Sequence, residues 1–364
     1  MKLEGYFRIK YMRVKLVIAL TALIIFQGWT FTLANVPYRV GTTTANFLEI
    51  GYGPAGIAMG DAYVSVANDL SAVYWNPAGL AFMQNNETLF MIQPWLVDVN
   101  ISFAAVGIPL RNVGTIALNI IHMGYGEMEV TTLRRQEGTG EMFDANEFAV
   151  TLSYGRTLAQ WFAFGAGVKY VSSQIWHVSG SAIAFDLGVL IKTDFFSLTG
   201  KQNDGMRIGM SISNYGSKLR YDGLDLLNPI DILPDENGNY KDVPGQFRLS
   251  YWELPLIFRV GASFKPILVR NHSVTIAADA LHPNNNSESV NLGMEYALNM
   301  PAFGKFFLRA GYKALFMESS EYGLTLGAGF SLNLLRNARI YCDVAYRDLG
   351  IMGASNCYGL GVEF

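Results

Sequence analysis

The sequence predicts an all-β fold, a transmembrane antiparallel β-barrel of about 14 strands with a small N-terminal plug, or hatch. Three features predict it: a final strand that ends on an aromatic residue, a secretory leader, and an apolar alternation that recurs from residue 86 onward. Alternation with a period of two places one set of side chains on each face of a strand. A wall between lipid and a polar lumen needs one apolar face and one small or polar face.

The last ten residues form the clearest strand. Tyr358, Leu360, Val362 and Phe364 alternate with small or polar residues, and the chain stops on Phe364. Chain ends usually fray, whereas an outer-membrane barrel closes on its last strand and places aromatic residues at the membrane interface. Gly359, Val362 and Phe364 also resemble the C-terminal signal that the barrel-assembly machinery reads, which makes that machinery an expected partner.

The N-terminus predicts export. Basic residues precede a short apolar run over 16–26, and small residues follow up to Ala34, so residues 1–34 are predicted to be a signal peptide. The run is shorter than the ~20 apolar residues of a membrane span. An uncleaved anchor is the alternative. Met1 and Met12 are both possible starts.

The composition fits a lipid-embedded protein. The chain is 51% hydrophobic and 16% charged, whereas soluble domains average about 25% charged residues. Its 37 Gly suit crowded lumen faces, and its 23 Phe and 19 Tyr suit aromatic girdles. The net charge of −3 gives no signal for a nucleic-acid partner. We therefore expect the protein to lie in the outer membrane, in contact with its lipid.

The alternation defines the predicted strands. Residues 86–364 form the predicted barrel domain, and an even count is what bacterial single-chain barrels require. The predicted strands are 86–95, 98–109, 114–126, 146–157, 161–174, 181–195, 205–215, 254–265, 271–282, 288–299, 304–316, 322–333, 338–348 and 355–364.

An even count places both chain ends in the periplasm, so the connections should alternate between short periplasmic turns and longer extracellular loops. Leu110–Val113, Thr157–Gln160 and Leu334–Asn337 are short, whereas Glu127–Ala145 and Gly216–Glu253 are long. The last of these is rich in apolar residues: Leu224, Leu226, Leu227, Ile230, Ile232 and Leu233. Either this loop packs on itself, or it is an apolar landing site for a lipidic ligand or a partner protein.

Charged residues within the predicted strands should face the lumen, because a Lys or Arg on the lipid face costs about 2–4 kcal/mol at the bilayer midplane. Their mixed signs predict pairing with one another or with the plug, not ion selection. They are Lys169, Asp186, Arg207, Arg259, Asp279, Glu295, Arg309, Lys313 and Asp343.

Residues 35–85 do not alternate and are predicted to form the plug at the periplasmic end. Four glycines between Gly51 and Gly60 give a turn-rich start. Asn76-Pro77 is a turn-initiating pair, and Pro77 suits the first position of a helix. A barrel of this size has a lumen that is filled or becomes a water channel.

Two stretches of this segment, Met59–Tyr63 (MGDAY) and Tyr74–Leu80 (YWNPAGL), resemble the PorV/PorQ family of the FadL-like superfamily, the fatty-acid-transporter-like barrels. The resemblance covers the plug, the barrel and the terminal Phe364. It implies an accessory barrel of the type IX secretion system that binds secreted cargo proteins. The alternative is a FadL-like passive transporter of hydrophobic small molecules.

The resemblance also implies which residues form the hatch motif. Either these residues contribute to function, or they only fold the plug. They are Gly56, Gly60, Asp61, Trp75, Asn76, Pro77, Ala78 and Gly79.

No catalytic, metal or cofactor site is predicted, and we do not expect an enzyme. The four His residues lack metal-ligand spacing, and the chain has no G-x-S-x-G nucleophile elbow. An outer-membrane lipase or acyltransferase is an outside alternative. The two cysteines, Cys342 and Cys357, lie on opposite faces of their strands and are not expected to pair.

Overall fold

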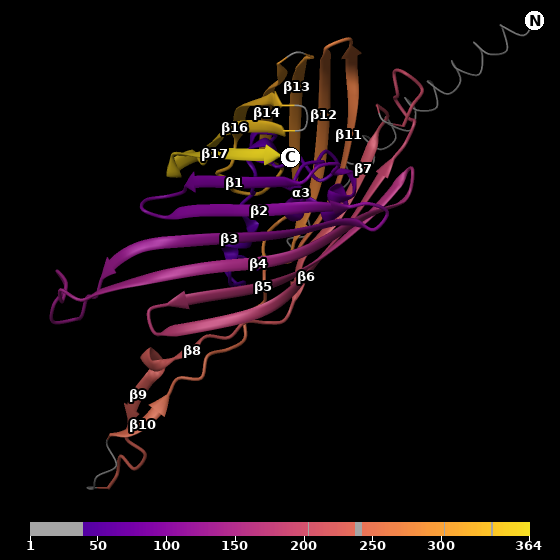
Figure 1. Cartoon of the computed structure of the whole chain (residues 1–364). Helices are drawn as coiled ribbons and strands as arrows, with labels where there is room; N and C mark the ends of the chain where they lie inside the picture. Colours follow the sequence, from indigo (N-terminus) through magenta and orange to yellow (C-terminus); the bar gives the residue numbers. More distant parts are fainter. Residues whose placement is uncertain (1–38, 203, 237–241, 302, 336–337) are drawn as a thin grey trace, which may run out of the picture. The chain divides into compact units, whose positions relative to one another are not determined.

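In the computed structural model, which describes residues 39–364 except 203, 237–241, 302 and 336–337, the chain forms a closed barrel of 14 antiparallel strands (Figure 1). The predicted signal peptide lies outside the described residues. The barrel strands are β1 (Glu87–Pro94), β2 (Asn100–Leu110), β3 (Gly114–Glu129), β4 (Met142–Ala159), β5 (Phe162–Ile175), β6 (Val178–Lys192), β7 (Arg207–Gly216), β11 (Ile257–Val269), β12 (His272–Pro283), β13 (Ser289–Met300), β14 (Gly304–Leu315), β15 (Leu324–Leu335), β16 (Ala338–Asp348) and β17 (Ala354–Glu363).

The first and last strands close the barrel. β1 pairs with β17 from Glu87 opposite Glu363 to Ile92 opposite Tyr358. Just beyond this ladder, Asn86 and Phe364 exchange two backbone hydrogen bonds of 3.1 and 2.9 Å. The terminal aromatic residue is therefore held in the wall, and its side chain is exposed on the outside.

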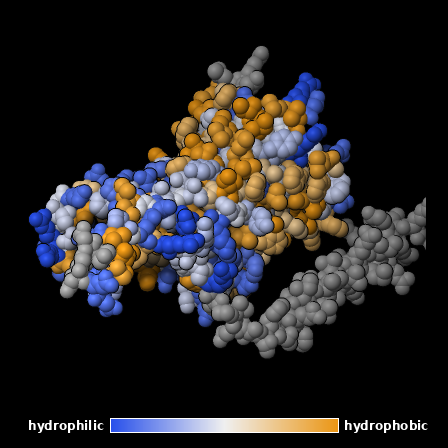
Figure 2. Space-filling view, turned by 90° about the horizontal axis from the view of Figure 1, so that it is seen from below, coloured by the Kyte–Doolittle hydropathy of each residue, from blue (hydrophilic) through white to orange (hydrophobic). Residues whose placement is uncertain are grey.

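The predicted faces are confirmed. Leu152, Ile183 and Leu308 are about half exposed on the outer wall, as are most large apolar residues with the same phase. Figure 2 shows hydrophobic residues gathered over the barrel wall and hydrophilic residues toward the projecting loops. Both cysteines are free: Cys342 is exposed and Cys357 is buried, as their phases predict.

The ends of the barrel differ in their connections. At one end β2–β3, β4–β5 and β11–β12 are joined by tight turns, and the β6–β7 connection over 193–206 is the long exception. At the other end lie the loops over 130–141 and 217–256. The first of these is shorter than predicted, because β3 and β4 extend beyond the lipid-facing pattern. We call the two ends the turn end and the loop end.

The long connection between β7 and β11 contains structure that the sequence did not predict. It holds β8 (Asp222–Gly223), the 3-10 turn η4 (Leu224–Leu226), and a hairpin of β9 (Leu227–Ile230) with β10 (Val243–Gln246). Figure 1 shows this β9–β10 hairpin standing away from the barrel wall. None of the helices among the described residues is long and apolar enough to cross a membrane.

The plug consists of short helical turns: η2 (Asn46–Glu49), α2 (Pro54–Ala58), α3 (Ala72–Trp75) and η3 (Pro77–Phe82). Almost every residue from Gly51 to Leu80 is buried, and the main apolar core forms between this segment and the lumen face of the wall. Helices this short are not stable alone, so their stability comes from packing inside the barrel.

Candidate functional site in the plugged lumen

The plug runs along the barrel axis rather than lying only at the periplasmic end, which corrects our prediction. It starts at the loop end, where the backbone NH of Thr44 donates to Glu253 O at 3.0 Å and Asn285 donates to Thr43 at 2.9 Å. It leaves at the turn end, at Asn86. A helix rises only about 1.5 Å per residue, whereas extended chain covers up to about 3.3–3.6 Å per residue. The plug combines short helical turns with extended chain, so its roughly forty residues are long enough to cross the lumen.

Glycines of the wall make room for the plug backbone. A Cβ atom on Gly155 would lie 2.8 Å from Pro77 O, and one on Gly359 would lie 2.8 Å from Pro54 Cγ. A Cβ on Gly165 or Gly311 would overlap plug backbone outright. A Cβ on Gly209 or Gly293 would also overlap plug backbone, whereas one on Gly188 or Gly327 would meet the side chain of a plug residue, Asn76 or Ala58. Wall and plug therefore touch backbone to backbone on most sides.

Asn76 of the hatch motif ties the plug to itself and to the wall. Its side-chain amide donates to Val64 O at 2.9 Å within the plug and to Val189 O at 3.0 Å on β6. Its carbonyl accepts from the NH of Ala78 at 3.1 Å, which caps η3. Pro77 then occupies the first position of this turn, where no backbone donor is needed.

Trp75 forms the centre of the plug core. It is fully buried and its ring NH donates to Tyr52 O at 2.7 Å. A Cβ on Gly56 would lie 2.5 Å from the indole nitrogen, so the ring occupies the space that this glycine leaves. Gly79 approaches the carbonyl of Ala67 in the same way. These hatch-motif residues have clear structural roles inside the plug.

Asp61 joins the plug to two strands. Its carboxylate accepts from Lys313 on β14 at 2.6 Å and from Arg347 on β16 at 2.8 Å. Gly60 and Asp61 both have left-handed backbone, with φ of 66° and 64°, which turns the carboxylate toward the wall. A Cβ on Gly60 would lie 2.7 Å from the backbone nitrogen of Tyr312.

The structure places the other predicted charges as follows. Lys169 pairs with Asp186 at 2.9 Å on neighbouring strands. Arg259 is buried, donates to Ser213 at 3.0 Å, and lies over the ring of Tyr74. Asp279 on β12 accepts from the plug NH of Val64 at 2.8 Å. Lys169 and Asp186 thus pair with each other, and Arg259 and Asp279 contact plug residues.

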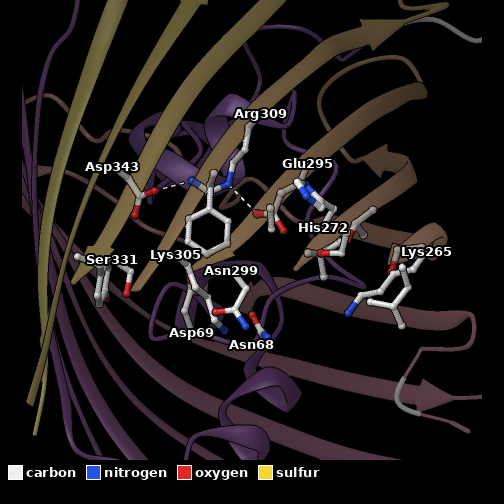
Figure 3. A pocket seen from close by; sticks show the side chains of 18 of the residues that line it. Asn68, Asp69, Lys265, His272, Glu295, Asn299, Lys305, Arg309, Ser331 and Asp343 are labelled. Carbon is white, nitrogen blue, oxygen red and sulfur yellow. Dashed lines mark hydrogen bonds and ion pairs between the residues drawn. The ribbon is translucent and has the colours of Figure 1, made fainter. Parts of the chain in front are cut away.

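The remaining predicted charges line a cavity at the turn end, which we call the vestibule (Figure 3). Its volume is about 430 Å³, and Asn68 and Asp69 of the plug contribute to its lining. The Arg309 guanidinium forms ion pairs with Glu295, at 2.8 Å, and with Asp343. Arg207 also lines the vestibule. The lining is rich in charges of both signs, so the vestibule suits water and ions better than an apolar solute.

Two functional-site residues escaped the sequence analysis. Arg347 is fully buried and pairs with Asp61, and it shares a strand face with Asp343, so its phase was a usable signal. Glu87 accepts from the plug NH of Leu70 at 3.1 Å and from the hydroxyl of Tyr341. No local pattern marked Glu87, because its partners come from the plug and from a strand far along the chain.

At the loop end, apolar side chains remain exposed on the projecting segment. Leu224, Leu227, Ile230, Ile232 and Leu233 are each at least 40% exposed. Packing of the loop on itself, one of the two alternatives above, therefore does not bury them. Among the residues that the structure describes, no group of three or more His, Cys, Asp or Glu side chains is placed to hold a metal ion.

Comparison with known families decides the classification. The family model described as "Type IX secretion system protein PorV" matches residues 34–232, which is more than half of the chain. The chain belongs to the PorV family. The match includes the plug and both stretches of the hatch motif. No curated protein sequence matches significantly.

Several solved structures share the barrel fold of this PorV-family protein. A FadL homologue of Pseudomonas aeruginosa is 13% identical with a TM-score of 0.52, covering 90% of this chain and 99% of its own. The toluene transporter TodX of Pseudomonas putida is 13% identical with a TM-score of 0.53, covering 86% and 97%. The toluene transporter TbuX of Ralstonia pickettii is 13% identical with a TM-score of 0.51, covering 86% and 97%.

At such low identity the likeness to these structures establishes the fold alone. The PorV family match and the closed barrel together indicate an outer-membrane protein. Neither the family nor these transporter-like barrels is described as an enzyme.

Proposed function

We propose that this PorV-family protein is an accessory barrel of a type IX secretion system that binds secreted proteins at its loop end. The observation that carries the proposal is the close contact between the plug and the barrel wall. Because the plug contacts the wall directly at glycines such as Gly155, Gly165 and Gly311, a solute path past these contacts would require the plug to move. A binding scaffold needs no such movement.

The exposed hairpin supplies a surface for a partner. Leu227 and Ile230 on β9 are 51% and 44% exposed on a segment that stands clear of the wall. Exposed apolar residues that gather on one segment mark interaction sites. A secreted protein with an apolar edge is the partner that such a surface would suit.

The second candidate is FadL-like passive transport of hydrophobic compounds. Its support is the shared fold with the toluene transporters. The charged lining of the vestibule weighs against it, because an apolar solute leaving the plug would enter a compartment lined by groups such as Arg309 and Glu295.

The test is a pull-down of secreted proteins with the full-length barrel and a Leu227→Ser/Ile230→Ser variant in detergent. We expect the variant to capture at least tenfold less cargo, because both apolar side chains become polar without any change in the wall. Val97→Ser/Leu133→Ser is the matched control, since both residues are almost fully exposed in other loops of the same end.

Equal capture by all three proteins would contradict a role for the hairpin. The secretion proposal would be wrong if the genome encoded neither a type IX translocon nor proteins with its C-terminal sorting domain. FadL-like transport would then be the favoured function.

A further inference from the structure

A second hollow lies on the outside of the barrel wall, and we propose that it binds the phosphate of an outer-leaflet glycolipid. This rim pocket has a volume of about 370 Å³. It lies over the loop-end halves of β5 and β6 and over the chain that follows β7. The proposal is independent of what the hairpin binds.

The rim pocket lies at the loop-end edge of the lipid-facing band of apolar side chains. Along β5 the outward side chains change from Val168 and Tyr170 to Ser172, and along β6 they change from Ile183 to Ser181 and Ser179. Apolar residues thus give way to hydroxyls at one level on both strands. That level is where lipid headgroups begin, because barrels place aromatic residues such as Tyr170 at the interface.

Two cations face this edge from the segment after β7. Leu219 bridges to Trp252 through backbone hydrogen bonds of 2.9 and 2.8 Å, and its side chain is fully buried over Gly180. Because side chains alternate along an extended segment, Lys218 and Arg220 point the other way, toward the outside. Both line the rim pocket.

The cations retain donors for a ligand. Arg220 lies 3.9 Å from Asp222, which is too far for a hydrogen bond, and its guanidinium stacks over the ring of Tyr251. Lys218 contacts Glu253 at 3.1 Å, and Arg39 contacts the same carboxylate at 3.1 Å. Three cations therefore face two carboxylates, and the excess positive charge borders a row of serine hydroxyls.

This chemistry suits a phosphate held at the membrane surface. A phosphate group accepts hydrogen bonds from Lys, Arg and hydroxyl donors at once. Basic pockets next to the bilayer recognise lipid headgroups in this way. The ligand is assigned to lipid rather than to free phosphate because the pocket opens on the outer wall directly above the apolar band, where acyl chains lie.

The test is native mass spectrometry of the full-length protein in detergent with two probes, lipid A with its phosphates and dephosphorylated lipid A. We expect retention of the phosphorylated form only. A Lys218→Gln/Arg220→Gln variant should bind it about 30-fold more weakly, since each cation near an anionic lipid surface contributes about 1 kcal/mol, or about fivefold. Lys201→Gln/Arg248→Gln removes the same charge from exposed positions outside the pocket and should bind normally.

Heat-modifiable migration in gels shows whether the variant still folds as a barrel. Equal binding of the two lipids, or an equal loss in both double variants, would overturn the proposal. Displacement of lipid A by inorganic phosphate at equal concentration would overturn the assignment to lipid.

Discussion

Asp61 of the plug accepts hydrogen bonds from Arg347 of β16 at 2.8 Å, and the same carboxylate pairs with Lys313 of β14. All three side chains are buried, so no solvent screens the contacts. One plug carboxylate thus pairs with two lumen cations on strands that are not adjacent. If the plug moved away, Lys313 and Arg347 would lose this counter-charge inside the lumen.

The Asp61→Asn substitution should loosen the plug without preventing barrel assembly. Removal of the carboxylate leaves two buried cations without a counter-charge, which costs about 3–5 kcal/mol when a buried pair is broken. Hydrogen exchange of residues 54–80 should rise strongly, while the barrel strands stay protected. Glu253→Gln is the matched control: Glu253 also bridges two cations, but in solvent, where such pairs contribute about 0–1 kcal/mol.

Acid should release the plug through the same residue. Burial alone would raise the pKa of Asp61, but the Arg347 guanidinium and the Lys313 ammonium hold that pKa below the ordinary 3.8. A group with a lowered folded-state pKa stabilises the fold above its unfolded pKa and loses this contribution as the pH falls through the folded value. Plug protection should therefore stay constant down to about pH 4 and fall below it. An unchanged acid transition in Asp61→Asn would contradict this origin.

The Gly165→Ala substitution should disturb the seat of the plug. Its Cβ would overlap the backbone of Pro77, which cannot move without shifting the turn at Asn76, and overpacking of this kind costs about 1–3 kcal/mol. Gly167→Ala, two residues along the same strand, meets mainly side chains, the nearest being Ser153 Oγ at 3.0 Å. We expect a lower midpoint of thermal unfolding for Gly165→Ala alone. The same loss in both variants would mean that strand propensity, not the plug, is responsible.

Removal of residues 35–85 should open a water-filled path. The barrel strands begin at Glu87, after the deleted segment, and the vestibule already provides a charged lining at the turn end. Liposomes that carry the deletion should swell in small sugars, whereas liposomes with the full chain should not. If the full chain were as permeable as the deletion, the plug would not be a seal.

The sequence was a good guide where structure depends on neighbours along the chain. The alternation located the 14 strands to within a few residues, because the wall must present apolar side chains to lipid at every second position. It also placed Arg309 and Asp343 on the lumen side of their strands. Their contact across β15 was out of reach, because it depends on the strand register and on Gly329 of β15, where a Cβ would overlap both side chains.

Structure that depends on contacts between distant parts of the chain was harder to predict from the sequence. Because the plug residues are small and its helices are short, no pattern along the chain indicates its course from Thr43 at the loop end to Asn86 at the turn end. The hairpin of β9 and β10 pairs only four residues a side, too few for a pattern to emerge. Arg347 lies four residues after Asp343 on β16 and has the same lumen-facing phase, so this position was predictable, whereas its partner Asp61 in the plug was not.

Photo-crosslinking in the native host shows directly whether the loop end binds a protein. A photoreactive amino acid replaces Leu227 on β9 in one strain and Leu133 in the other long loop in a second strain. We expect protein adducts at position 227 that contain secreted cargo or translocon subunits, and far fewer at position 133. Adducts to lipid alone at position 227, or identical protein adducts at both positions, would contradict it.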